Sequence, residues 1–508
     1  MRYSGAVNPT SRGDTLPRCG GILGTLVAVA AVVSALVIAA PASAQVVPAA
    51  PPPAADPTPV PSPTPDPVSD AEADGAEEPV DEQETPEARD DAVPEEEEEA
   101  SSDRIRYKDP LDIDEEPLKL KWDNFLSGLR GITQYSLFDH QLRFRLGFRF
   151  QGDGTLVRPS SDLEAALGDM PNRTDFRRFR IFAEGILRKM YFRIEFDAAA
   201  DAGFKSVYLE GREGGLEIWG KLLGKFRYGQ FQEPFSLEQN VSSFDTSFVE
   251  TSLAVNTIAP GNNIGAMVYD ASKNRKFTWA AGAFSWGQEA NDNASTSLLS
   301  LSGRFGYQPV ARHEGGTIFH VGLSLSSRTP TSDKVRYQAR PEARFVTPFA
   351  DTGDVPASRN NLLGLEAAWK NGNMWAQAEW IRADVTSSVA GDPCFAGIVI
   401  QTGYFLTGLS RPWDNLWGVW GRVRPEQSYN WGNPFKKSSG GIWEVAGRFS
   451  TVDLTDGLVE GGVVRNLTLG VNWYLSSTTK LQANWIHSRV KDVGHANIWV
   501  LRFQYAIK

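Results

Sequence analysis

Residues 140–150 alternate, one by one, between apolar and cationic or polar side chains. The apolar positions are Leu142, Phe144, Leu146, Phe148 and Phe150, and the cationic positions between them are Arg143, Arg145 and Arg149. Side chains of a β-strand point alternately to opposite faces, so this segment predicts a strand with one apolar and one cationic face. Residues 499–507, at the end of the chain, repeat the pattern more mildly.

Alternating stretches of about 8 to 12 residues recur between turn clusters from about Lys119 onward, which predicts an all-β protein. We expect further strands at residues 179–185, 191–198, 467–475 and 481–485, and a short helix in a loop at residues 162–168. A stretch of about 400 residues without a second change in composition favours one large barrel over several sandwiches.

The residues on the apolar face favour a membrane barrel over a soluble sandwich. In a sandwich the apolar face would meet a second sheet, and any single strand here permits that alternative. Six tryptophans, however, are expected to point outward near strand ends, where aromatic rings form the interfacial girdles of a membrane barrel. They are Trp369, Trp375, Trp380, Trp473, Trp485 and Trp499.

The N-terminal region predicts export. Arg12 and Arg18 precede an apolar run at residues 21–40, and an Ala-x-Ala site follows, so residues 1–44 are expected to be a cleaved signal peptide. The alternative is a retained transmembrane helix, for which the run is long enough. Residues 45–117 are expected to be a Pro-rich, acidic, disordered linker, and residues 118–508 the outer-membrane barrel.

The acidic charge of the chain belongs to this N-terminal region. The net charge is −11, but residues 1–100 hold 19 acidic and 4 basic residues. Residues 101–508 therefore hold 43 acidic and 47 basic residues, so the predicted barrel is slightly basic.

Strand parity predicts which basic side chains face the lumen. A lumen lined by these side chains would carry the fixed positive charge that a path for anions needs. The planar guanidinium of arginine is also suited to binding oxyanions. The alternative is that these side chains only pair with Glu184, Glu195 and Asp197 on the same wall and stiffen it. The predicted pore-lining and anion-binding residues are Arg143, Arg145, Arg149, Arg178, Arg180, Arg193, Lys225 and Arg227.

Other function classes have little support in the sequence. The five histidines are scattered without the spacing of a metal site, and neither a Gly-x-Ser-x-Gly elbow nor a phosphate-binding glycine loop occurs. We therefore expect no enzyme activity, no metal and no cofactor. The cationic positions are expected to face a lumen, so no nucleic acid is expected as a partner.

Four stretches in order resemble the phosphate-selective porin O/P family, over most of residues 120–508. The most recognisable stretch is residues 228–238, which read YGQFQEPFSLE. The others are residues 177–197 with 207–210, residues 361–380 with 401–408 and 421–423, and residues 443–450 with 469–475.

The resemblance implies an antiparallel barrel of about 16 strands in the outer membrane, usually trimeric, with one long loop folded into the pore. Residues 242–252 are the expected loop; relatives often carry arginine where this chain has Phe244 and Thr251. We therefore expect a passive, anion-preferring porin in contact with outer-membrane lipid. Its solutes would be small anions, with phosphate or polyphosphate as candidates. The alternatives are a general or carbohydrate porin and a structural surface barrel.

Overall fold

The computed structural model describes most of the predicted barrel. The residues it describes are 134–137, 142–188, 190–199, 202–211, 224–285, 297–312, 316–425, 428–429 and 440–507. The expected signal peptide (1–44) and linker (45–117) lie outside this set. Among the described residues, no helix has the length and apolarity needed to cross a bilayer.

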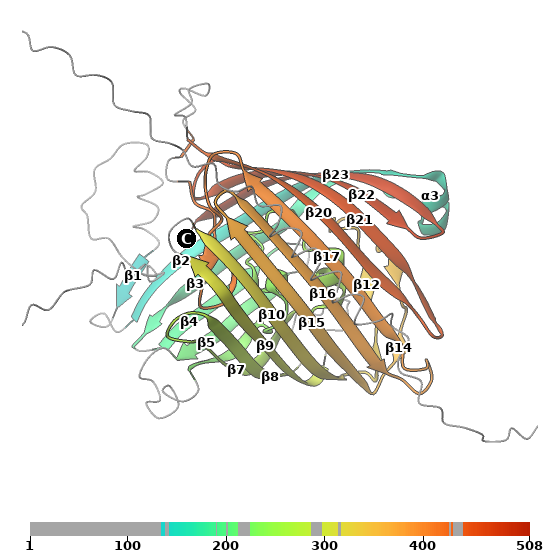
Figure 1. Ribbon diagram of the computed structural model, residues 1–508, viewed down its shortest axis with the longest axis horizontal. Coiled ribbons are helices and arrows are strands. Elements are labelled where there is room, and N and C mark those ends of the chain that lie inside the picture. The colour runs from blue at the N-terminus through green and yellow to red at the C-terminus, as the bar shows by residue number, and fades with distance from the viewer. Residues whose placement is uncertain are drawn as a thin grey trace, which may run out of the picture. The chain divides into compact units, whose positions relative to one another are not determined.

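One antiparallel sheet of 17 strands dominates the described residues, and 16 of its strands form a closed ring (Figure 1). Each strand of the ring pairs with its neighbour in sequence, and β23 returns to pair with β2, as at Gln504 and Gln151. The short β1 (Gln134–Leu137) pairs with the start of β2. The prediction of a barrel of about 16 strands is confirmed. The ring consists of β2 (Leu142–Pro159), β3 (Arg173–Leu187), β4 (Met190–Asp197), β5 (Gly203–Gly211), β6 (Lys225–Gln232), β7 (Asn262–Ala271), β8 (Phe277–Ser285), β9 (Ser297–Arg312), β10 (Thr317–Pro330), β15 (Arg359–Asn371), β16 (Met374–Thr386), β17 (Cys394–Phe405), β20 (Ile442–Asp456), β21 (Val459–Tyr474), β22 (Thr479–Val490) and β23 (Gly494–Ile507).

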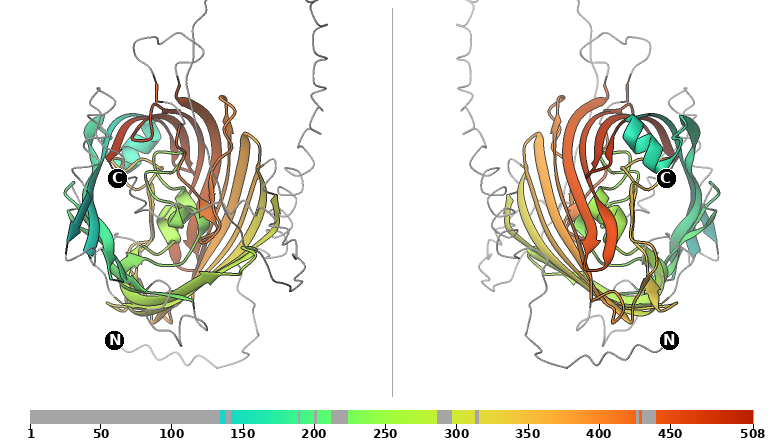
Figure 2. Two further views of the ribbon diagram at one scale, coloured as in Figure 1. Left: turned by 90° about the vertical axis from the view of Figure 1, so that its left-hand side faces the viewer. Right: turned by 90° about the vertical axis from the view of Figure 1, so that its right-hand side faces the viewer.

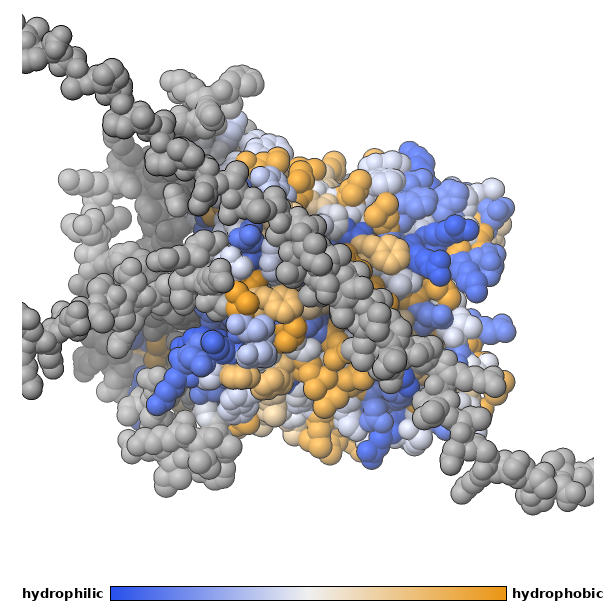
Figure 3. Space-filling model, viewed as in Figure 1, coloured by the Kyte–Doolittle hydropathy of each residue, from blue (hydrophilic) through white to orange (hydrophobic). Residues whose placement is uncertain are grey.

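The predicted alternation sets the two faces of the wall. In β2, Leu146 and Leu156 are exposed on the outside, whereas Arg149, Gln151 and Asp153 are buried on the inside. Figure 3 shows hydrophobic side chains across the middle of the barrel surface and hydrophilic side chains gathered at its right-hand end. An apolar outer band with polar inner positions is the arrangement of a barrel that stands in lipid.

The strand directions distinguish the two ends of the barrel. At the turn end lie the start of β2, the end of β23 and short connections such as residues 372–373. At the loop end lie longer connections, including residues 160–172 with the predicted helix α3 (Ser161–Leu167). Ser160 caps this helix, since its hydroxyl accepts a hydrogen bond from Leu163 N–H.

Three of the connections that the structure describes fold inside the ring, and Figure 2 shows the first of them, with its short helices, within the barrel. The first inner segment (residues 233–261) contains α5 (Leu237–Asn240) and α6 (Leu253–Ile258). The second (residues 331–358) also enters from the loop end, and its short strands are β11 (Lys334–Val335), β12 (Gln338–Ala339), β13 (Ala350–Asp351) and β14 (Val355–Pro356). The third (residues 406–425) enters from the turn end and contains β18 (Trp413–Asp414) and β19 (Val419–Trp420).

Part of the inner wall is apolar because it packs against these segments and not against water. Ile381, Phe395 and Val452 share one buried cluster with Leu253 of the first inner segment and Phe349 of the second. Burial of such side chains stabilises the inner segments by about 1.5–3 kcal/mol each. The lumen is therefore open on one side and filled by a hydrophobic core on the other.

The tryptophan predictions are partly wrong. Trp375 faces inward and is fully buried. Its indole N–H donates to Glu444 Oε1 at 2.8 Å, and its ring packs beside that of Trp420. Trp473 does face outward near the turn end, where it stacks on Trp443 with ring centroids 4.8 Å apart. Trp499 also faces outward but lies near the middle of its strand.

Gly229, within the YGQFQEPFSLE stretch, allows β5 and β6 to pair closely. Its φ is 130°, and a Cβ atom there would lie 2.1 Å from the Val207 carbonyl oxygen. We expect Gly229→Ala to lower the free energy of unfolding by about 3 kcal/mol, because it adds backbone strain and a clash. Urea unfolding in lipid vesicles, followed by tryptophan fluorescence, measures this change. Gly447→Ala is the control, since its Cβ would meet only Leu469 at 3.9 Å; equal losses in both variants would contradict the prediction.

Candidate functional site

A cavity of about 790 Å³ lies between the wall formed by β2 to β6 and the first and second inner segments. Ten basic and four acidic side chains line it, so positive charge predominates. The acidic ones are Glu195, Asp197, Glu250 and Glu342, and the basic ones are Arg149, Arg173, Arg177, Arg178, Arg180, Arg193, Lys205, Arg227, Arg340 and Arg344.

Five of the eight predicted pore residues line this cavity, namely Arg149, Arg178, Arg180, Arg193 and Arg227. Arg143, Arg145 and Lys225 do not, because they lie at the ends of β2 and β6 nearest the turn end. Parity assigns a side chain to the correct face of a strand, but it gives no information on depth along the barrel axis.

Most of these arginines pair with carboxylates of the same wall, as the alternative interpretation of the sequence expected. Arg180 contacts Glu195 Oε1 at 3.0 Å and Asp197 Oδ2 at 2.8 Å. Arg193 pairs with both Glu184 and Glu195. These ion pairs reduce the net field that an arriving anion meets and hold the guanidinium groups in place.

Arg227 has a different environment, because aromatic rings surround it. It donates two hydrogen bonds to Glu210 Oε2, at 2.6 and 3.0 Å. Its guanidinium also lies 4.4 Å from the Tyr208 ring centroid and 5.0 Å from that of Trp417, which belongs to the third inner segment. Cation–π contacts of this kind stabilise a charge that has left water.

Arg149 lacks such close pairing although it is buried, with only 5% of its surface exposed. Its nearest carboxylate contact is with Glu195, at 3.8 Å, and its buried Nε has no hydrogen-bond partner. Its guanidinium lies between the rings of Phe182 and Phe244, with centroids 5.1 and 5.2 Å away. Because Arg149 lines the cavity and its carboxylate contact is long, its guanidinium is less neutralised than those of Arg180 and Arg193.

The prediction that residues 242–252 fold into the barrel is confirmed. Inward-facing side chains of the wall donate to the main-chain carbonyl groups of this stretch. Gln504 donates to Phe244 O at 2.9 Å, Lys480 to Thr246 O at 3.0 Å and Asn472 to Ser247 O at 2.8 Å.

Sequence reasoning missed one important group, Arg177 with Glu250 and Arg502. Alternation places Arg177 on the outer face, because Arg178 and Arg180 point inward. A β-bulge changes this: Gln151 pairs with Arg178 and Gly152 with Phe176, so Arg177 is an extra residue. Arg177 therefore reaches the same Glu250 carboxylate as Arg178, and only the Arg177–Arg178 doublet in the sequence hinted at such a cluster.

The surroundings of Glu250 keep it ionised. Burial raises the pKa of this carboxyl, but Arg177, Arg178 and Arg502 outweigh burial and hold the pKa well below its ordinary value. The carboxylate consequently remains negatively charged at any pH near neutrality.

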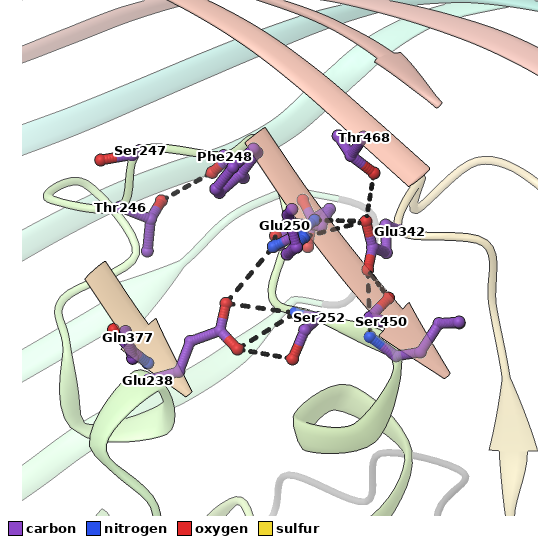
Figure 4. Close-up of polar contacts among 12 residues, drawn as sticks. Glu238, Thr246, Ser247, Phe248, Glu250, Ser252, Glu342, Gln377, Ser450 and Thr468 are labelled. Atoms are coloured by element: carbon purple, nitrogen blue, oxygen red, sulfur yellow. Dashed lines mark hydrogen bonds and ion pairs between the residues drawn. The ribbon is translucent and has the colours of Figure 1, made fainter. Parts of the chain in front are cut away.

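A second buried ionic cluster joins the first two inner segments to the wall. Arg448 on β20 contacts Glu342 Oε2 at 2.5 Å and Glu238 Oε1 at 3.3 Å. Figure 4 shows Ser450 and Thr468 converging on Glu342, and Ser252 on Glu238; the respective hydrogen bonds are 2.5, 2.7 and 2.6 Å. This cluster fixes the position of the cavity boundary opposite β2 and β3.

The third inner segment is attached by main-chain contacts to the opposite wall. Arg304 donates to Trp417 O at 2.6 Å and to Gly418 O at 2.9 Å, and Lys370 donates to Arg411 O at 2.7 Å. Trp417 thereby reaches the cavity lining.

In the described part of the chain, no group of histidine, cysteine, aspartate or glutamate is arranged to hold a metal ion.

A closed barrel with an apolar outer band, a charged lumen and inward-folded loops defines a membrane channel of the porin class. The sequence matches the family described as phosphate-selective porin O and P over residues 144–507, and the chain belongs to this family. It is thus an outer-membrane porin, as predicted.

Individual relatives are more distant. The chain is 24% identical to Porin O of Pseudomonas aeruginosa over 411 residues, which covers 72% of this chain and 88% of Porin O. It is 31% identical over 182 residues to an uncharacterized protein of Caulobacter vibrioides, covering 35% and 34% of the two chains. Among solved structures, an anion-selective porin from Comamonas acidovorans aligns with a TM-score of 0.45 and 12% identity, covering 72% of this chain and all of that one.

Proposed function

We propose that the barrel is a passive diffusion channel that prefers small anions, with phosphate-like oxyanions as its characteristic solutes. The predominance of basic side chains around the cavity carries this proposal, since ten basic and four acidic residues line it. A local excess of fixed positive charge raises the anion concentration and lowers the barrier to anion passage.

The arginines have separate parts in this proposal. Arg149, with its unpaired Nε, and its neighbours Arg178 and Arg180 are the proposed contact groups for an anion in transit. Arg193 and Arg227 remain paired with carboxylates and contribute to the positive electrostatic potential at the cavity wall. Arg143, Arg145 and Lys225 lie nearer the turn end, where we propose that they guide anions between the cavity and that mouth.

Single-channel recording tests the proposal. In a planar bilayer under a potassium chloride gradient, we expect the reversal potential to lie close to the chloride equilibrium value. Millimolar phosphate should then reduce the chloride current, because phosphate oxygens bind guanidinium groups more tightly than chloride does. A reversal potential near the potassium value would refute the anion preference.

The paired state of most arginines favours a second candidate, a general diffusion porin in which charge only shapes the field. That pore would show weak selectivity and no response to phosphate, so the same recording separates the two. We also propose a homotrimer, which membership of the family supports. Chemical cross-linking in detergent tests it by the size of the largest product.

A further inference from the structure

The Glu250 side chain occupies a cage of arginines at the edge of the cavity. Its carboxylate accepts hydrogen bonds from Arg177 Nε at 2.7 Å, from Arg177 Nη2 at 3.0 Å and from Arg502 Nη2 at 2.7 Å. Arg178 lies at 3.7 Å. Planar carboxylate oxygens between guanidinium forks have the same kind of contacts that a bound oxyanion would make.

The cage belongs to the wall, and the carboxylate belongs to the first inner segment. The bulge in β3 turns both Arg177 and Arg178 toward the cavity. Arg502 on β23 is oriented by Asp153 on β2, with N–O distances of 2.6 and 2.7 Å. Arg178 is oriented in turn by Gln151 Oε1, at 2.7 Å, so two of the three cage arginines have positions that do not depend on Glu250 alone.

The first inner segment is also held without the Glu250 side chain. Arg448 donates to the main-chain carbonyl of Glu250 at 2.9 Å, and Arg502 donates to that of Val249. Two residues after Glu250, the N–H of Ser252 donates a hydrogen bond to the Glu238 carboxylate. The carboxylate can consequently leave the cage by side-chain rotation while the main chain stays in place.

We propose that the Glu250 carboxylate is a built-in competitor for the anions that cross the pore, occupying the Arg177–Arg178–Arg502 cage until a passing oxyanion displaces it. This inference rests on the proposed anion preference. A cage without Glu250 would hold an oxyanion tightly and slow its release, whereas a tethered carboxylate rebinds as the ion departs. Conduction needs sites that an ion can enter and also leave, and internal competition meets that need.

The effect of removing the competitor is measurable. When a site is free only a fraction of the time, its apparent affinity is lowered by that fraction, so Glu250→Gln should reduce the phosphate concentration that halves the chloride current by about tenfold. The residence time of each blocking event should lengthen as well. Glu250→Asp, which retains the charge but shortens the reach, should reduce that concentration by about threefold and serves as a second variant if Glu250→Gln folds poorly.

Asp175→Asn is the matched control, because Asp175 lies on β3 two residues before Arg177 and carries the same charge. It pairs with Arg173, which is neither in the cage nor among the proposed contact groups. A similar gain in phosphate block in this variant would mean that overall charge, not competition, causes the effect, and would overturn the inference. An unchanged block in both Glu250 variants, with anion preference intact, would also overturn it. A wild-type pore without anion preference would instead overturn the proposed function and the inference together.

Discussion

Pores of the double variant Arg149→Gln/Arg180→Gln should show a chloride-to-potassium permeability ratio about tenfold below that of the unchanged protein. The two residues face each other across β2 and β3 and both line the cavity. Their replacement removes two positive charges and leaves Asp197 without its Arg180 contact, so the local field turns less favourable to anions. The reversal potential under a potassium chloride gradient measures the ratio.

The control for this experiment removes the same charge from the outer face. Arg465 on β21 and Arg489 on β22 lie opposite each other in the strand register, and both are exposed. The double variant Arg465→Gln/Arg489→Gln should leave the permeability ratio within about twofold of the original value, because exposed charges are screened over about 10 Å. If both double variants changed selectivity equally, the cavity would not be the selective region.

Loss of the Arg448 guanidinium should be the most destabilising of the single changes considered for the lumen. Arg448→Ala leaves the buried carboxylates of Glu238 and Glu342 without their cation. Removing one partner of a buried ion pair typically costs about 3–5 kcal/mol, and we expect a loss of that size in the free energy of unfolding. We also expect larger and noisier single-channel conductance, since the first two inner segments lose their common attachment.

Urea unfolding in lipid vesicles and single-channel recording measure the two effects. Lys334→Ala breaks the exposed pair with Asp354 in the second inner segment and should cost no more than about 1 kcal/mol. A normal conductance in Arg448→Ala would show that the hydrophobic cluster around Phe395 and Leu253 is sufficient to hold the inner segments.

Sequence reasoning was most successful where a property depends on neighbouring residues alone. Arg149 and Leu146 could be assigned to opposite faces because side-chain direction along a strand has a period of two. The same rule failed at Arg177, where one inserted residue reversed the direction. At Trp375 the rule holds, because β16 keeps this residue on the same face as Gln377; the outward assignment relied on residue type and missed the contact with Trp420 of the third inner segment. The bulge has no local signal beyond the Arg177–Arg178 doublet, and the contact with Trp420 has none.

The wall and its two faces follow from local alternation, because each strand carries its own pattern of inward and outward side chains. The selective region does not, because it forms only when residues far apart in the chain meet. Glu250 reaches Arg502 across 252 positions, and Arg448 reaches Glu238 across 210. Barrel closure and inward folding of the loops bring these partners together, and burial then makes each unpaired charge costly enough to hold one arrangement.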